Sequence, residues 1–188
     1  HSNSVAIGAS ALATQNAGAD SYNVAMGYNA GTAVTTGIKN TLIGGLAGDA
    51  LTDADNNVAI GYQALTTEDI GSRTVAIGYQ TLFAHNSLGA NTTGESNTAV
   101  GSSALKANTT ANNNTAVGGG AMFTNTTGDE NVALGLNTLY SNTTADGGTA
   151  VGSQALTSVT TGDNNTGVGL HAGLVITTGA KNTVIGSL

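Results

Sequence analysis

Short apolar stretches recur along the chain, and each one ends at a glycine that opens a run of mostly small or polar residues. The stretches read VAI, TAV or a close variant. We call the glycine after each stretch the marker glycine. Marker glycines stand at Gly8, Gly27, Gly44, Gly61, Gly78, Gly101, Gly118, Gly135, Gly152, Gly169 and Gly186. They are 17 residues apart in eight of the ten intervals and 19 and 23 apart in the other two. A fixed period over the whole chain predicts a repeat protein whose units stack on one another.

Each apolar stretch predicts a short β-strand, because its first residue is β-branched and its last is an aliphatic residue or Met. In the unit that ends at Gly78 these residues are Val75 and Ile77. Since alternate residues of a strand point to the same side, we expect Val75, Ile77 and their equivalents to form the core. An asparagine stands four residues before the marker glycine in eight of the eleven units. We expect these asparagines to hydrogen-bond along the axis of the stack.

The second half of the unit carries two further signals. Alanine and then usually leucine stand three and four residues after the marker glycine, as in Ala104–Leu105, and predict a second short strand or a corner. A pair of threonines, such as Thr126–Thr127, follows in six units and often precedes a glycine. We expect that glycine to adopt positive φ in the turn that closes the unit.

The period decides the fold class. Seventeen residues are too few for the helix pairs of α-helical repeat proteins, so each unit is one coil. The predicted fold is all-β, a parallel β-roll or β-solenoid of about eleven 17-residue coils, with residues 1–188 as one repeat domain. The longest interval predicts a loop insertion near residues 84–91. Because the chain begins inside a unit, we expect it to be a fragment of a longer fibre whose anchor lies elsewhere.

Composition and charge remove several classes of partner. The chain has no cysteine, so disulfides and thiolate metal sites are excluded. A net charge of −7 offers no basic surface, so we expect no binding to nucleic acid. No apolar run approaches the length that spans a bilayer, so we expect no membrane insertion by this segment.

Two consecutive units place a tyrosine and a glutamine directly after the marker glycine. These residues are Tyr62–Gln63 and Tyr79–Gln80, and the insertion that follows brings His85 and Asn86. An exposed tyrosine beside an amide suits contact with a sugar or a protein, so these six residues are the predicted ligand-binding site. The alternative is that the tyrosines only cover an oligomer seam.

We predict no catalytic site, no metal site and no cofactor. The three histidines fall in unrelated places of the repeat, and acidic residues such as Asp129, Asp146 and Asp163 recur at one turn position instead of converging. These acidic residues suit solvated turn positions.

Apolar pairs bear on association. In Ala99–Val100 and Ala104–Leu105 we expect one residue of each pair to face out of the coil, since neighbouring strand residues point to opposite faces. The result is an apolar strip along the stack, which suits the seam of a homo-oligomer.

The stretch NSVAIGASALA at residues 3–13 resembles the head repeats of trimeric autotransporter adhesins of the YadA type. Later units, such as NTAVGSSALKANTT, are similar to repeats of bacterial surface fibres and phage tail fibres. The resemblance implies a left-handed parallel β-roll in a homotrimer. It also implies an extracellular fibre, attached to the outer membrane, that binds a host surface protein or glycan. The unit of 17 residues is longer than the typical repeat of that family.

The leading hypothesis for function is therefore a non-catalytic structural and adhesive segment of a trimeric surface fibre. A phage tail-fibre shaft that binds a receptor is a close alternative. An ice-binding β-solenoid is the alternative from another class, because the threonine pairs form ladders from coil to coil. Threonines next to each other point to opposite faces, however, whereas an ice-binding plane uses Thr-x-Thr spacing.

Overall fold

The computed structural model describes residues 3–18, 20–66, 71–83 and 94–187, and their only regular secondary structure is a set of three-residue strands. Each strand belongs to one coil, and we name a coil by its strand. The strands are β1 (Val5–Ile7), β2 (Val24–Met26), β3 (Thr41–Ile43), β4 (Val58–Ile60), β5 (Val75–Ile77), β6 (Thr98–Val100), β7 (Thr115–Val117), β8 (Val132–Leu134), β9 (Thr149–Val151), β10 (Thr166–Val168) and β11 (Thr183–Ile185).

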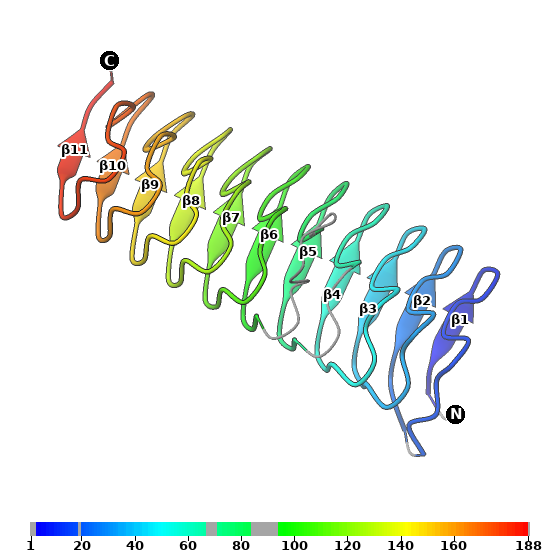
Figure 1. Ribbon diagram of the computed structural model, residues 1–188. Coiled ribbons are helices and arrows are strands. Elements are labelled where there is room, and N and C mark those ends of the chain that lie inside the picture. The colour runs from blue at the N-terminus through cyan, green and yellow to red at the C-terminus, as the bar shows by residue number, and fades with distance from the viewer. Residues whose placement is uncertain (1–2, 19, 67–70, 84–93, 188) are drawn as a thin grey trace.

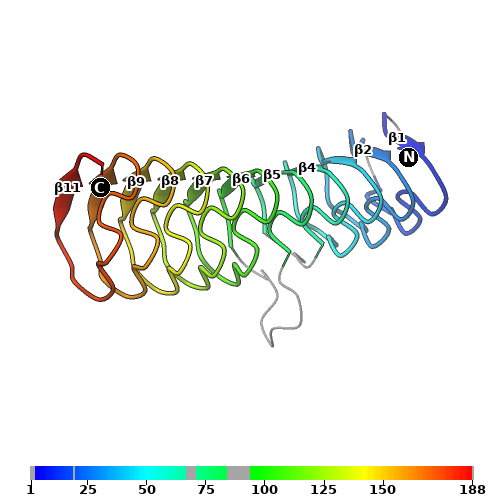
Figure 2. The same ribbon diagram turned by 90° about the horizontal axis from the view of Figure 1, so that it is seen from above.

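The strands form one parallel sheet in chain order, from β1 at one end to β11 at the other. Equivalent residues are paired in every step, so that Ala76 of β5 lies between Ala59 of β4 and Ala99 of β6. Figures 1 and 2 show the coils in a single row, with the strands along one face and the two termini at opposite ends. The predicted all-β, parallel β-solenoid is confirmed. Its register continues from β5 to β6 although the interval between them is six residues longer than the period.

The strands turn the opposite side to the core from the one predicted. The middle residue of the strand is buried from β2 to β10, as at Ala76, whereas Val75 and Ile77 on either side of it remain partly exposed. The expectation that Val75, Ile77 and their equivalents form the core was wrong. The inside of a coil is narrow, so the small side chain fits there and the larger ones face outward.

Leucines on the far wall of the coil fill the space that the alanines leave. The fully buried residues at this position, four after the marker glycine, are Leu65, Leu82, Leu105, Met122, Leu139 and Leus of the next coil such as Leu156. Ala104 is also fully buried, so both residues of the pair Ala104–Leu105 face inward. The prediction that one of them faces out was wrong for this pair, although it holds for Ala99–Val100. The reason is that Leu105 has φ of 49°, which ends the alternation of a strand. The segment forms turns, so the predicted corner is present and the second strand is not.

Where glycine replaces this leucine, larger side chains nearby occupy the same volume. A Cβ added to Gly48 would lie 2.7 Å from Leu42 Cδ2 and 2.9 Å from Leu51 Cδ1. Leu42 stands in the middle of β3, where most other strands have alanine. The core is therefore conserved in volume from coil to coil while its residues change places.

The marker glycines are required by the close stacking of the backbone. Gly44 has φ of +131°, and a Cβ there would lie 2.5 Å from the carbonyl oxygen of Gly61 in the next coil. By contrast, Gly37 and Gly128, which follow threonine pairs, do not have positive φ, and Ala111 takes the same place in the β6 coil. The prediction that these glycines supply a left-handed turn was wrong.

The predicted asparagine ladder is confirmed. Asn40 donates its backbone N–H to Asn23 Oδ1 at 2.8 Å, and Asn57 donates to Asn40 Oδ1 at 2.9 Å. The Nδ2 of Asn40 donates to the Ala54 carbonyl across the interior of the coil at 2.8 Å. Each asparagine thus satisfies backbone groups in two places, which a buried polar side chain must do to be tolerated. The bonds hold neighbouring coils together and also close each coil on itself.

Candidate ligand-binding surface

The two predicted tyrosines form an exposed stack. Tyr62 and Tyr79 follow the marker glycines of the β4 and β5 coils and are 50% and 53% exposed. Their ring centroids are 6.1 Å apart and the ring planes differ by 13°. A Cβ on Gly45 would lie 3.4 Å from Tyr62 Cδ2, so the stack ends over Gly45 and does not reach Tyr28. Two stacked rings with this exposure present a flat apolar surface with polar hydroxyls at its edge.

The two predicted glutamines form an amide ladder beside this stack. Gln80 Nε2 donates to Gln63 Oε1 at 3.0 Å. Gln80 Oε1 in turn accepts a hydrogen bond from Lys106 Nζ at 3.2 Å. The ladder therefore continues into the β6 coil through a lysine that the sequence did not single out.

Lys106 belongs to a column of side chains that stand five residues after the marker glycine in four successive coils. This column, which we call the aromatic–lysine column, consists of Phe83, Lys106, Phe123 and Tyr140. The ammonium nitrogen of Lys106 lies 5.9 Å from the Phe83 ring centroid and 5.5 Å from the Phe123 ring centroid. The rings of Phe123 and Tyr140 stack at 5.0 Å with an interplanar angle of 11°. The lysine is thus held between two aromatic rings, a geometry that stabilises a cation.

The column could have been found by writing the sequence in rows of one period. Phe123 and Tyr140 are 17 residues apart, and so are Lys106 and Phe123. Phe83 is separated from Lys106 by the insertion, which hides the alignment. His85 and Asn86, the other two predicted site residues, lie outside the described residues.

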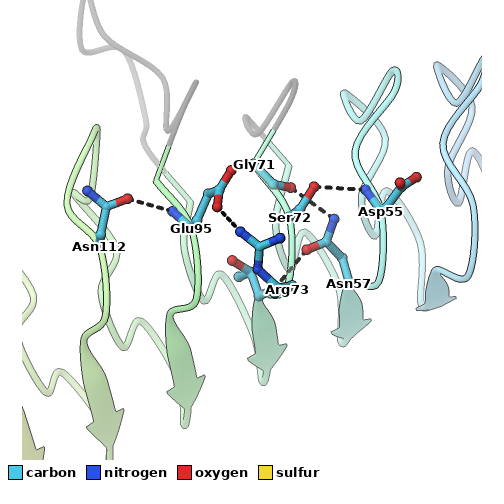
Figure 3. A network of polar contacts seen from close by, with 8 residues as sticks. Asp55, Asn57, Gly71, Ser72, Arg73, Glu95 and Asn112 are labelled. Atoms are coloured by element: carbon cyan, nitrogen blue, oxygen red, sulfur yellow. Dashed lines mark hydrogen bonds and ion pairs between the residues drawn. The ribbon is translucent and has the colours of Figure 1, made fainter.

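One ion pair connects the coils on the two sides of the insertion. Arg73 in the β5 coil pairs with Glu95 in the β6 coil, and Figure 3 shows Arg73 pointing to Glu95. The backbone N–H of Glu95 donates to Asn112 Oδ1 of the following coil at 2.9 Å. In the same way the backbone N–H of Asp55 donates to Ser72 Oγ at 3.1 Å. The pair is exposed, so it contributes little to stability but uses the charge of Arg73.

The recurring acidic residues accept hydrogen bonds from the preceding coil. The backbone N–H of Asp129 donates to Asp146 Oδ1 at 2.7 Å, and that of Asp146 donates to Asp163 Oδ1 at 3.0 Å. Asn112, Asp129, Asp146 and Asp163 therefore form a ladder along one edge. Among the residues that the structure describes, no three His, Cys, Asp or Glu side chains are grouped so that they could hold a metal ion.

Asp49 is the one acidic residue whose titration is clearly shifted. Burial raises the pKa of its carboxyl group to about 6, partly opposed by a hydrogen bond with the backbone. Its Oδ1 is buried and has no hydrogen-bond partner. Asp49 occupies the place of the aromatic–lysine column in the β3 coil, two coils before Phe83. A carboxylate here is costly, so the protonated form is favoured in the fold.

The threonine pairs hold the coils together with one hydroxyl of each pair. Thr126 Oγ1 donates to the carbonyl of Thr143 at 2.9 Å, and Thr143 Oγ1 donates to the carbonyl of Thr160 at 3.1 Å. The second residue of each pair, such as Thr127, is exposed. The first threonine is therefore occupied by bonds between coils.

The outer side of the sheet is an apolar surface. We call it the strand face and define it by the side chains three and one residues before the marker glycine and one after it. The large aliphatic residues and Met on this face are Ile7, Met26, Ile43, Ile60, Ile77, Val100, Val117, Leu134, Val151, Val168 and Ile185. All of them are at least partly exposed, as are Leu136 and Leu170 after the marker glycine. No charged residue occupies any of the three positions in any coil.

The described residues include no helix long and apolar enough to cross a lipid bilayer. The chain matches no protein-family model, no curated protein and no solved structure.

Proposed function

We propose that the chain is a non-catalytic rod segment of a homotrimeric fibre at the outside of a cell or virus particle, and that it attaches the fibre to a surface receptor. The observation that carries this proposal is the strand face, an apolar and uncharged surface that follows all eleven strands. With strands about 4.8 Å apart, this surface is roughly 50 Å long.

A surface of this kind is unfavourable on a free chain in water. Ile7 is 53% exposed, Met26 43% and Leu134 38%. Continuous apolar patches of this extent mark sites of association. A second copy of the same face is its natural cover, because the repeat places equal residues at equal heights along the axis of each chain.

The number of three chains, the left-handed coil and the extracellular location follow the resemblance of NSVAIGASALA to the heads of trimeric adhesins. The receptor side of the proposal relies on the tyrosine stack, the amide ladder and the aromatic–lysine column. These groups combine flat rings with polar groups, as carbohydrate and protein contact surfaces do. A bacterial surface fibre is the first candidate, and a phage tail-fibre shaft uses the same physical design.

Sedimentation of the purified chain tests the association. We expect a mass of three times the 18.3 kDa of one chain. The double substitution Val117→Asp with Leu134→Asp places charges on the strand face and should yield monomers that keep their β circular dichroism. The matched control is Thr127→Asp, which adds a charge at an exposed turn and should leave the trimer intact. A wild-type chain that sediments as a monomer at micromolar concentration would contradict the proposal.

One feature of the strand face favours the second candidate, an ice-binding solenoid. In β6, β7, β9 and β10 a threonine and a valine face outward with one residue between them, as Thr98 and Val100 do. This spacing gives a flat regular array, which adjacent threonines do not. A face that orders water must stay open to solvent, so the two candidates exclude each other. Thermal hysteresis of a monomeric chain would favour ice binding, and its absence together with a trimer favours the fibre.

A further inference from the structure

Lys106 is fixed in place by three neighbours of different chemistry. Its Nζ donates to Gln80 Oε1 at 3.2 Å and lies 5.9 Å and 5.5 Å from the ring centroids of Phe83 and Phe123. A lysine side chain normally loses about 2 kcal/mol of rotamer entropy when it is ordered. Here the rings and the amide already hold it, so a ligand that binds Lys106 meets a group that is ordered in advance.

The charge of Lys106 is not neutralised within the described part of the chain, where the only ion pair is Arg73–Glu95. An ammonium group has three N–H donors, and Gln80 accepts one of them. The whole chain has four Lys and Arg residues against eleven Asp and Glu. A partly buried cation without a carboxylate partner is therefore exceptional in this molecule and suits an acidic group from outside.

The surroundings of Lys106 suit a sugar ring. Phe123 and Tyr140 form a flat stack on the C-terminal side, against which the C–H face of a pyranose can pack. Gln63 and Gln80 offer amide groups that can donate to and accept from sugar hydroxyls. The combination of apolar rings with a few oriented polar groups is the usual composition of a small-molecule site.

The geometry points to an acidic carbohydrate as the ligand of this surface, with its carboxylate on Lys106 and its ring on the aromatic–lysine column. This inference rests on the proposed adhesive function and names the class of receptor. The amides of Gln63 and Gln80 distinguish the sugar from a simple anion, because they bind the hydroxyl groups that a simple anion lacks.

The test uses the full chain, isothermal titration calorimetry and three probes. The first probe is a hexasaccharide of alternating glucuronic acid and N-acetylglucosamine. The second is the same hexasaccharide with its carboxyl groups reduced to alcohols, and the third is a hexaglutamate peptide. We expect the acidic hexasaccharide to bind at least about tenfold more tightly than the reduced one, which is the factor for one charge-assisted hydrogen bond.

Substitutions locate the effect. Lys106→Met keeps the length and apolar contacts of the side chain and should remove the preference for the acidic probe, while Lys106→Arg should keep it. The matched control Lys39→Met removes an exposed charge in the β3 coil and should leave the preference unchanged. Circular dichroism checks that each variant keeps its fold.

Three results would overturn the inference: equal affinity for both hexasaccharides, an unchanged preference in Lys106→Met, or equal binding of hexaglutamate. A chain that is trimeric and adheres to cells but does not discriminate between the hexasaccharides leaves the fibre function standing and refutes the ligand class. A monomer that discriminates between them supports the Lys106 site and refutes the fibre.

Discussion

Replacing Asn131 by alanine removes one rung of the asparagine ladder. Asn131 is fully buried, and its Oδ1 accepts the backbone N–H of Gly148 at 2.7 Å. Its Nδ2 donates to the carbonyl of Ala145 at 2.8 Å. The Ala145 carbonyl also accepts from Asn142 Nδ2 at 3.1 Å, so it keeps a partner in the variant. The substitution therefore leaves one buried backbone donor, the Gly148 N–H, without its acceptor.

The cost follows from this count. A buried amide that loses its partner costs about 1–3 kcal/mol, and the space left by the side-chain amide adds to it. We expect Asn131→Ala to lower the free energy of unfolding by about 3 kcal/mol, a large share of the roughly 5–15 kcal/mol of a typical domain. The control is Asn16→Ala, because Asn16 is exposed and should change the stability by less than about 0.5 kcal/mol.

Two measurements check this prediction. Urea denaturation followed by circular dichroism gives the change in stability, and hydrogen exchange gives the protection of the Gly148 amide. We expect both to fall in Asn131→Ala and neither to fall in Asn16→Ala. A loss of less than about 1 kcal/mol with the Gly148 amide still protected would refute the reasoning, because the ladder would then not carry the buried backbone group.

Three further changes test other parts of the fold. Gly44→Ala should cost about 3 kcal/mol or more in urea denaturation, because its Cβ would meet a carbonyl of the next coil at 2.5 Å, whereas Gly45→Ala should be nearly neutral. The pKa of Asp49 is about 6 in the fold against 3.8 as the model value, so the wild type should lose stability as the pH rises from about 4 to 6. Asp49→Asn should remove that loss and raise the thermal midpoint at pH 7, and a lower midpoint would contradict the assignment. Asp146→Ala should lose about 1 kcal/mol in the same assay, while Asp146→Asn should not, since Asn112 already fills this role with an amide; equal losses would refute it.

The period and the asparagine ladder were predictable because both depend on residues that recur at a fixed place. The backbones of neighbouring coils approach so closely at Gly44 that no other residue fits, and this constraint keeps the glycine visible in every unit. Asn40 is equally constrained, because it must donate and accept in fixed directions. The tyrosine stack was predictable for the same reason, since Tyr62 and Tyr79 are one period apart.

The sides of the strand were not predictable from the rule that large apolar residues lie inside. The rule placed Ile77 in the core, but the interior of the coil admits only Ala76 at that height because Leu82 enters from the opposite wall. Leu82 could not be placed by alternation either, since its φ of 49° lies in the left-handed region. The role of Lys106 depended on neighbours that the insertion shifts out of alignment.

The in-register pairing of β1 to β11 has a consequence for how such a chain changes its length. Every strand meets only the strands directly before and after it, at a fixed distance in the sequence. Removing or duplicating one whole period between β6 and β10 joins two surfaces that already fit, because each interface in this part of the chain is chemically alike. Recombination between neighbouring repeats can therefore make the rod shorter or longer by one step of about 4.8 Å without redesigning either end.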